Sequence, residues 1–221
     1  AKLRILDPAC GSGSFLLGAY AALIQWHERY FQMEDGRRRT EDERPTTEAG
    51  RRSSVPRPRS YYLDFDGRVR LTAHLKRQIL LDNLFGVDID AQAVEVTRFS
   101  LSLKALEDTR RDELYEERNL FKQTMLPDLR DNIKCGNSLI GPDYFAGQMF
   151  GEPAELMRVK PFDWQREFPQ VFDGRPLGSS ETLKVLPAGG FDAVIGNPPY
   201  IRIQTLQETN PAQVAYLKQQ Y

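Results

Sequence analysis

The chain has 221 residues, of which 40% are hydrophobic and 28% charged, and this is the composition of an ordinary globular protein. Its 30 Lys and Arg against 31 Asp and Glu leave a net charge of -1, which excludes a strongly basic nucleic-acid module as a description of the whole chain. Two cysteines exclude a disulfide framework and a Cys-rich zinc site, and no apolar run approaches the roughly 18 residues of a membrane span. We therefore expect a reduced, cytoplasmic protein with no metal site and no membrane partner.

The predicted elements alternate between short apolar runs and longer segments whose apolar side chains recur every three or four residues. The first strand ends at Asp7-Pro8, because proline cannot continue the hydrogen bonding of a sheet. Asp90 is expected to cap a helix, and Asp66-Gly67 suits a two-residue hairpin turn. In chain order we expect a strand at 3–6, a helix at 14–33, a hairpin at 62–71, a helix at 73–83, a strand at 84–88, a helix at 91–106, a strand at 131–135, an irregular stretch at 142–187 with a short helix near 154–158, a strand at 190–196, and a helix opening at 210–211.

The 36–60 range differs in composition from the rest of the chain. It holds eight Arg, four acidic residues and three Pro, with almost no large apolar side chain. Such a segment cannot bury enough surface to offset the entropy lost on ordering, so we expect a basic, disordered insertion. A solvated linker is favoured over an arm that contacts phosphates, which the local charge of +4 (eight minus four) would also permit.

The order of strands and helices is typical of an α/β fold with a mainly parallel sheet. In such sheets, ligands bind beyond the carboxyl ends of the strands, at the point where the strand order reverses. The four predicted strands are followed by Asp7-Pro8, Asp88, Gly136-Asn137 and Asn197-Pro198-Pro199-Tyr200. Polar groups from distant segments are therefore expected to meet at one rim of the sheet.

The turn after the first strand contains Gly11 and Gly13, which let backbone N–H groups approach a ligand ahead of a helix. The dinucleotide-binding fingerprint requires a third glycine where this chain has Leu16, and an acid about twenty residues further on. Asp88 comes 75 residues after Gly13 (88 minus 13), so NAD is disfavoured. The two oxygens of Asp88 suit the two hydroxyls of a ribose, the alternative being a solvated strand end or a helix cap.

The last strand is followed by Asn197-Pro198-Pro199-Tyr200. Two prolines fix the backbone and remove two N–H donors, which leaves the Asn197 amide and backbone carbonyls as the polar groups. These acceptors can converge on an –NH₂ group attached to an aromatic ring. Such an amine is a poor nucleophile because its lone pair is delocalised into the ring. Hydrogen bonds from the amine protons to two acceptors would localise the lone pair on the nitrogen. Tyr200 offers a flat face on which a base can stack, worth roughly 1–3 kcal/mol. Taken alone, the tetrapeptide favours a Pro-rich turn after a strand.

Four motifs in this order resemble those of the γ class of N6-adenine DNA methyltransferases, of the kind fused in type IIG restriction-modification proteins. The cofactor motif comes first and the catalytic motif later, with no large recognition segment between them beyond 142–187. Phe162-Asp163-Trp164 and Glu167-Phe168-Pro169 are similar to the type IIG methyltransferase regions. The four motifs are residues 5–16, 86–90, 135–139 and 191–201.

The resemblance implies a Rossmann-like methyltransferase fold that uses S-adenosyl-L-methionine. Asp7 to Gly13 would hold the methionine part of this cofactor, Asp88 would bind its ribose, and Ile89 would lie against its adenine ring. Asn137 would face the adenine amino group, where many relatives have Asp. The cofactor-binding residues expected from the resemblance are Asp7, Pro8, Ala9, Cys10, Gly11, Gly13, Phe15, Asp88, Ile89, Asn137 and Ser138.

The resemblance also implies that the partner is double-stranded DNA with a flipped adenine. Asn197 and the Pro198 carbonyl would accept from the target N6 amine, and Tyr200 would stack on the flipped base. The methyl group would pass in line to nitrogen without a covalent intermediate. Cys10 would then be a small packing residue of the cofactor turn and not a nucleophile.

Other substrates share this chemistry. The same tetrapeptide occurs in methyltransferases for glutamine side chains of release factors and for guanine N2 of ribosomal RNA, and N4 of cytosine is a further candidate. A non-catalytic methyltransferase-like module is the alternative from another class, against which the intact Asn197, Tyr200 and cofactor turn argue. A nuclease within this chain is disfavoured, because Pro127-Asp128 is not followed by Glu-x-Lys.

The resemblance implies a fold of seven strands, of which four can be identified in the sequence. We therefore expect residues 1–221 to be a partial methyltransferase catalytic domain. Its further partners would be the recognition domain and a possible nuclease domain of the same full-length polypeptide.

Overall fold

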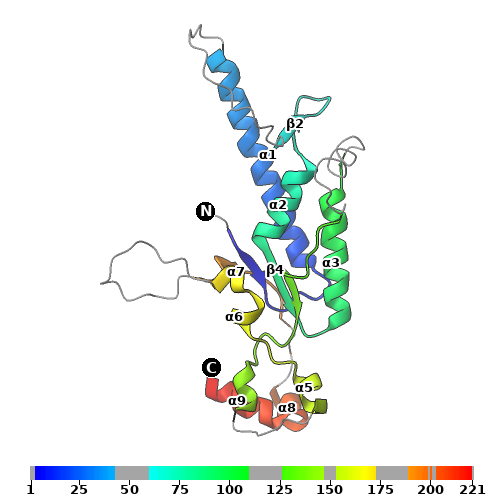
Figure 1. The fold of residues 1–221 in the computed structure, drawn as a ribbon, viewed down its shortest axis with the longest axis vertical. Coiled ribbons are helices and arrows are strands. Elements are labelled where there is room, and N and C mark those ends of the chain that lie inside the picture. The colour runs from blue at the N-terminus through cyan, green and yellow to red at the C-terminus, as the bar shows by residue number, and fades with distance from the viewer. Residues whose placement is uncertain are drawn as a thin grey trace, which may run out of the picture.

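A parallel β-sheet lies at the centre of the structure (Figure 1). The computed structural model describes residues 3–42, 60–109, 126–146, 153–172, 189–198, 200 and 203–220, and within these ranges the sheet has four strands. The register places Ile5 beside both Leu84 and Ala193. The strands are β1 (Ile5–Asp7), β4 (Leu84–Asp88), β5 (Ile133–Cys135) and β6 (Ala193–Val194).

The strand order, β5-β4-β1-β6, defines the topological switch point of the sheet. From β1 the chain passes to β4 and then to β5 on one side, and it later returns to place β6 on the other side of β1. This is the arrangement of a Rossmann-like α/β fold, so the expected fold class is confirmed. The reversal lies between β1 and β6, and a ligand is expected at the carboxyl ends of these strands.

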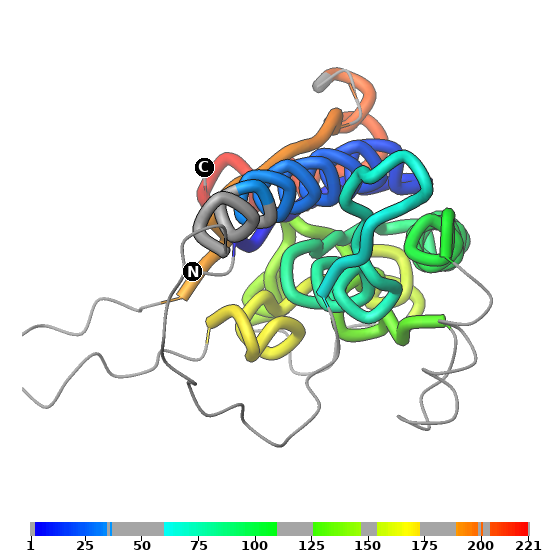
Figure 2. The backbone as a smooth tube through the Cα atoms, turned by 90° about the horizontal axis from the view of Figure 1, so that it is seen from above, coloured from blue at the N-terminus to red at the C-terminus, as the bar shows by residue number. Residues whose placement is uncertain are grey.

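Side chains of the strands alternate between two hydrophobic clusters, one on each face of the sheet. Ile5 and Leu84 belong to the first cluster, whereas Leu6, Phe85 and Val87 belong to the second. The helices involved are α1 (Ser14–Asp42), α2 (Ala73–Asn83) and α3 (Ala91–Leu106) in the first cluster, and α6 (Trp164–Glu167) and α7 (Pro169–Phe172) in the second. Seen from above, α1 runs along one side of the strands and the yellow α6–α7 segment lies on the other (Figure 2).

Three of these helices, α2, α3 and α6, begin at a side-chain cap. Thr72 accepts a hydrogen bond from the Leu75 N–H at the start of α2, at 3.4 Å. Asp90 accepts from the Gln92 N–H at the start of α3, at 2.9 Å. Each cap satisfies a backbone donor of the first helical turn, and the predicted role of Asp90 as a cap is confirmed.

Helix α1 is longer than the sequence pattern predicts. It continues past the expected end near residue 33 to Asp42, so residues 36–42 are helical and not part of a disordered insertion. The apolar period ends near Met33, but a helix does not need it to continue, because Arg and Glu are themselves good helix formers. The rest of the expected insertion, 43–59, lies outside the described residues.

The expected hairpin is present as β2 (Tyr61–Leu63) and β3 (Val69–Leu71). Its turn is longer than the predicted Asp66-Gly67 pair. The Asp64 N–H donates to the Arg68 carbonyl at 2.9 Å, and the Gly67 N–H donates to the Asp64 carbonyl at 3.0 Å. Asp64 also accepts from the Arg68 N–H through its carboxylate, at 2.9 Å, and this side-chain contact stabilises the wider turn.

The carboxyl ends of the strands face a group of short helices at the lower end of the view in Figure 1. Tyr216 links two members of this group, α9 and η1, because its hydroxyl donates to Asp143 at 2.8 Å and accepts from the Gly141 N–H at 3.2 Å. The described part of 142–187 is thus more helical than expected, although the short helix near 154–158 is confirmed. The group comprises η1 (Pro142–Phe145), α5 (Pro153–Val159), α8 (Ile203–Thr209) and α9 (Pro211–Gln220), the last opening with Pro211 as predicted.

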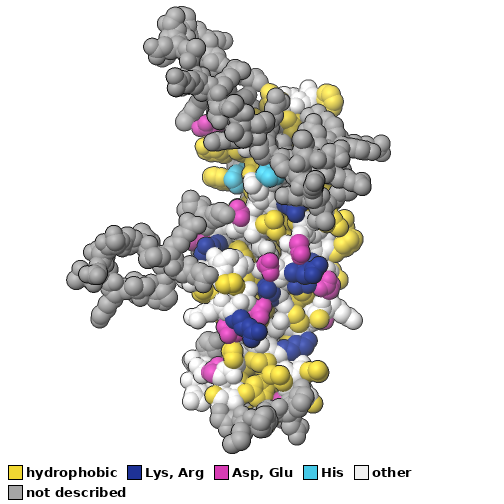
Figure 3. Space-filling model, in the orientation of Figure 1, with side chains coloured by type: hydrophobic (Ala, Val, Ile, Leu, Met, Phe, Trp, Pro, Cys, Tyr) yellow, Lys and Arg dark blue, Asp and Glu magenta, His cyan; other side chains and the backbone are white. Residues whose placement is uncertain are grey.

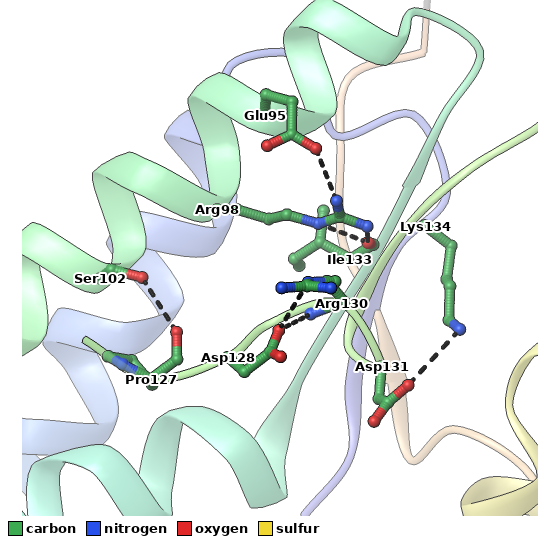
Figure 4. Close-up of polar contacts among 9 residues, drawn as sticks. All are labelled: Glu95, Arg98, Ser102, Pro127, Asp128, Arg130, Asp131, Ile133 and Lys134. Atoms are coloured by element: carbon green, nitrogen blue, oxygen red, sulfur yellow. Dashed lines mark hydrogen bonds and ion pairs between the residues drawn. The ribbon is translucent and has the colours of Figure 1, made fainter. Parts of the chain in front are cut away.

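Ion pairs and hydrogen bonds lie along β5 and α3 (Figure 4), and Lys134 of β5 also pairs with Glu167 of α6 at 3.4 Å. Arg98 of α3 donates to the Ile133 carbonyl at 3.0 Å and pairs with Glu95 at 2.6 Å. Lys134 lies 3.8 Å from Asp131. Acidic and basic side chains are accordingly intermixed on the face shown in Figure 3, and hydrophobic side chains gather at its lower end. Within the described ranges, no helix is both long and apolar enough to cross a membrane.

Candidate functional site

Asp88, at the end of β4, joins three of the four predicted motifs through hydrogen bonds. Its Oδ2 atom accepts from the Gly11 N–H at 2.7 Å, and its Oδ1 atom accepts from the Asp90 N–H at 2.9 Å. Its backbone carbonyl accepts from the Gly136 N–H at 2.9 Å. Asp88 is half-buried, and because a carboxylate offers about four lone-pair positions, it can still accept from a ligand.

The turn after β1 is fixed against β4 and α3. The Cys10 N–H donates to the Val87 carbonyl at 3.0 Å, and the Thr97 hydroxyl donates to the Gly11 carbonyl at 2.7 Å. Gly13 has a φ of +85°, and a Cβ atom there would lie 2.8 Å from Thr97 Cγ2. Both the backbone conformation and the close approach of Thr97 require glycine at this position. The turn therefore holds its shape through the protein's own contacts.

Cys10 is buried in this turn. A Cβ atom on Gly86 would lie 3.2 Å from Cys10 Sγ and 2.9 Å from Leu16 Cδ1, so the glycine lets β4 approach the turn and α1 closely. Burial, followed by the charges of Asp88 and Asp7, raises the pKa of the Cys10 thiol to about 12. A thiol with this pKa carries almost no thiolate near neutral pH, which agrees with a packing role.

The fourth motif meets the first at Asp7 and Gly196, on the two sides of the switch point. Asp7 is buried at the end of β1, and its Oδ1 atom accepts from the Ala9 N–H at 3.1 Å. Gly196 follows β6 with a φ of +148°, and a Cβ atom there would lie 2.5 Å from Asp7 Oδ1. Burial raises the pKa of the Asp7 carboxyl, the Ala9 hydrogen bond lowers it, and the charge of Asp88 raises it further. The segment that leads to Asn197 thus starts directly beside the expected cofactor turn.

Asn137 and Ser138 follow β5 and are held by residues further along the chain. The Asn137 N–H donates to the Lys160 carbonyl at 2.7 Å, and Trp164 Nε1 donates to the Ser138 carbonyl at 3.3 Å. The Asn137 Oδ1 atom accepts from the Leu139 N–H at 3.1 Å. The oxygen keeps a second lone pair, and the resemblance predicts that Asn137 faces the adenine amino group of the cofactor.

Pro8 and Ala9 are half-buried in the turn after β1, whereas the remaining predicted residues are exposed. Phe15 and Ile89 are about half exposed, at 50% and 47%, although both are large and apolar. Asn197 and Pro198 are exposed, and Tyr200 is 94% exposed. The Asn197 side chain makes no hydrogen bond to any residue in the described part of the chain. The structure therefore brings the four motifs to one rim, but it leaves the side chains expected to meet bases uncovered.

Several residues that shape this rim were not predicted from the sequence. Thr97 lies within a predicted helix, and nothing in the sequence indicates that its hydroxyl reaches Gly11. Gly86 and Gly196 belong to apparent strands, where an isolated glycine does indicate a close backbone approach. Lys160 and Trp164 lie in the stretch expected to be irregular, and of these only Trp164 belonged to a recognised sequence similarity.

Two hollows of the surface lie away from this rim. One of about 540 Å³ lies beside α3 and β5 and is lined by Phe99, Ser102 and Leu126 among others, and one of about 310 Å³ lies at the hairpin, beside Phe65 and Arg70. Neither contains a residue of the four motifs. We place the site at the rim because the carboxylates, backbone donors and glycine turns converge there. Within the described residues, no three His, Cys, Asp or Glu side chains cluster as metal ligands do.

The fold and the site define the class of protein. A Rossmann-like sheet carries a glycine turn and a strand-terminal acid beside the switch point, with Asn197 following the strand on the opposite side. The family model described as Eco57I restriction-modification methylase matches residues 82–221. This is more than half of the chain, and the chain belongs to this family. The resemblance seen in the sequence is confirmed, and a methylase requires a methyl donor.

Three curated relatives are similar to the chain. A putative type II restriction enzyme and methyltransferase, RM.MjaORFECS2P of Methanocaldococcus jannaschii, is 31% identical over 63% of this chain and 9% of its own length. The type II restriction enzyme and methyltransferase RM.Eco57I of Escherichia coli is 24% identical over 99% of the chain and 16% of its own length. The adenine-specific methyltransferase PglX of Streptomyces coelicolor is 24% identical over 92% and 12%.

The chain thus spans less than a fifth of the length of each of these relatives. No solved structure matches it.

Proposed function

We propose that the chain is the catalytic part of a restriction-modification protein that methylates adenine N6 in duplex DNA, with S-adenosyl-L-methionine as the methyl donor. The observation that carries this proposal is the contact between Asp7 and Gly196. It places the segment that leads to Asn197 beside the turn that would hold the cofactor. The similarity to PglX, an adenine-specific methyltransferase, supports adenine as the target base.

The residues at the rim fit this cofactor. Asp88 is anchored by two backbone donors and keeps acceptor capacity for ribose hydroxyls. Ile89 follows it directly and presents exposed apolar surface for the adenine ring, and Asn137 lies after the next strand. The turn at 9–13 would accommodate the methionine part. When bound, S-adenosylmethionine supplies a methyl group on a positively charged sulfur atom.

The opposite side of the rim suits an amine that must become nucleophilic. Asn197 and the Pro198 carbonyl would accept from the two protons of the adenine N6 amine, and this draws its lone pair out of the ring. The nitrogen would then bond to the methyl carbon as the carbon–sulfur bond of the cofactor broke, and one amine proton would leave to solvent. Tyr200 would stack on the extruded base and offset part of the few kcal/mol that base flipping costs.

The proposal is tested with the full-length protein, S-adenosylmethionine carrying a labelled methyl group, and duplex DNA. The DNA is digested to nucleosides after the reaction, and the label is expected in N6-methyladenine. Label in N4-methylcytosine, or transfer to RNA or to a release factor in place of DNA, would assign one of the other amines. Tight cofactor binding without transfer to any of these substrates would indicate a non-catalytic module.

A further inference from the structure

We infer that Lys160 is a positioning residue that holds the two sides of the adenine end of the cofactor site at their proper spacing. This inference rests on the proposed function, because it assigns Ile89 and Asn137 to the cofactor's adenine. Lys160 follows α5 and lies outside the four motifs. Its backbone and its side chain each contact one of the two residues.

The backbone of Lys160 holds the Asn137 side. Its carbonyl accepts from the Asn137 N–H at 2.7 Å, and the next residue, Pro161, pairs with Asn137 in a parallel β-bridge. The Lys160 N–H donates to the Leu156 carbonyl at 2.9 Å and so ties this point to α5. The position of Asn137 beyond the end of β5 is therefore set by the end of α5.

The side chain of Lys160 holds the Ile89 side. Its Nζ atom donates to the Ile89 carbonyl at 2.8 Å, across 71 residues of sequence. Ile89 lies between Asp88, which would bind the ribose, and the cap of α3 at Asp90. Lys160 thus adds a further bridge between the segment after β4 and the segment after β5, beside the hydrogen bonds from Gly136 to the Asp88 carbonyl and from Cys135 to the Ile89 carbonyl. An adenine ring would lie at this end of the site.

The backbone conformation at Lys160 indicates that this side chain is needed. Its φ of +49° lies in the left-handed region, which favours glycine and is uncommon for a residue with a Cβ atom. Such strain persists where the surroundings fix it, and it is frequent at ligand clamps. The hydrogen bond to Ile89 is at the surface, so it adds little to the stability of the fold. The effect of the side chain is therefore expected in ligand binding.

The test uses the full-length protein and two cofactor products that differ only in the base, S-adenosylhomocysteine and S-inosylhomocysteine. Calorimetry gives the Kd of both for the unaltered protein, for Lys160→Met and for Lys160→Gly. Methionine keeps an unbranched stem without the charge, and glycine also relieves the backbone strain. Lys104→Met is the matched control, because Lys104 pairs with Glu107 at the end of α3, away from the rim. Thermal unfolding is measured on all four proteins.

Both Lys160 variants should bind S-adenosylhomocysteine about tenfold more weakly, with a smaller loss for the inosine form, so that discrimination between the bases falls. The melting temperature of Lys160→Gly should stay the same or rise. An unchanged ratio of the two Kd values, or equal losses together with a lower melting temperature in both variants, would overturn the role of Lys160. Absence of binding by the unaltered protein would instead refute the cofactor assignment on which the inference rests.

Discussion

The two sides of the switch point differ in how much of their geometry the chain itself fixes. On the cofactor side, Asp88, Cys10 and Gly11 are held by hydrogen bonds that link β1, β4 and α3. On the target side, Asn197 and Tyr200 are exposed, and Asn197 has no hydrogen-bond partner among the described residues. A site held in place before its ligand arrives loses less entropy on binding. The comparison indicates that the proposed cofactor side is preformed within this chain, whereas the proposed target loop is left for the substrate to cover.

The largest effect is expected at the target loop. Asn197→Ala should lower methyl transfer at least about 100-fold, because the amine loses an acceptor where charge develops. The Kd for S-adenosylmethionine should stay within about twofold, since the Asn197 side chain is not assigned to the cofactor. Single-turnover transfer and calorimetry measure the two quantities, with Gln219→Ala, an exposed position on α9, as the control. If Asn197→Ala also lost affinity for the cofactor, the cofactor side and the target side would not act independently.

A second comparison uses two glycines of the same region. Gly13→Ala should lower the free energy of unfolding by about 1–3 kcal/mol, because alanine at a φ of +85° is strained and would press on Thr97. Gly18→Ala, within α1 and with open space around it, should raise it by about 0.5–1 kcal/mol. Urea denaturation measures both. Equal effects of the two changes would mean that the cofactor turn is not held in the described shape.

Two neighbouring acids separate ligand binding from helix capping. Asp88→Ala should weaken cofactor binding by roughly 1–3 kcal/mol, through unpaired ribose hydroxyls and loss of the Gly11 anchor. Asp90→Ala should lower stability by about 1 kcal/mol through loss of the α3 cap and leave the cofactor affinity nearly unchanged. If Asp88→Ala left the affinity unchanged, Asp90 or no acid would be the ribose ligand.

The smallest effect concerns the two cysteines, which lie in a buried turn and at an exposed strand end. Cys135 should react with iodoacetamide in the folded protein. Cys10 should not, because its raised pKa of about 12 leaves it protonated well above neutral pH and burial blocks access. Mass spectrometry after labelling at pH 8 shows which thiol is modified. Rapid labelling of Cys10 in the folded protein would contradict a tightly packed cofactor turn.

The sequence predicted the elements whose signals are local. The strand ending at Asp7, the helix cap at Asp90 and the proline that opens α9 each depend on a side chain acting on its own segment. The sequence also predicted that the strand ends converge, because parallel strands place their carboxyl ends at one edge. Those predictions needed no knowledge of packing.

The features that the sequence did not predict depend on contacts between distant segments. Helix α1 extends to Asp42 although its apolar period stops earlier, and no local signal distinguishes this from a linker. The hydrogen bond from Thr97 to Gly11 joins residues 86 positions apart, and that from Lys160 to Ile89 joins residues 71 apart. In both cases the residue type is common on exposed helices and loops, so only the tertiary structure identifies its role.

Amide hydrogen exchange of the full-length protein tests the central comparison most directly. It is measured on the free protein, with S-adenosylhomocysteine, and with S-adenosylhomocysteine plus adenine-containing DNA. Peptides covering residues 9–13 and 87–90 should exchange slowly in the free protein and more slowly with cofactor, because their N–H groups are already bonded. Peptides containing Asn197 and Tyr200 should exchange fast until DNA is added. Equal exchange of the two regions in the free protein, or full protection of the Asn197 peptide by the cofactor alone, would contradict the account.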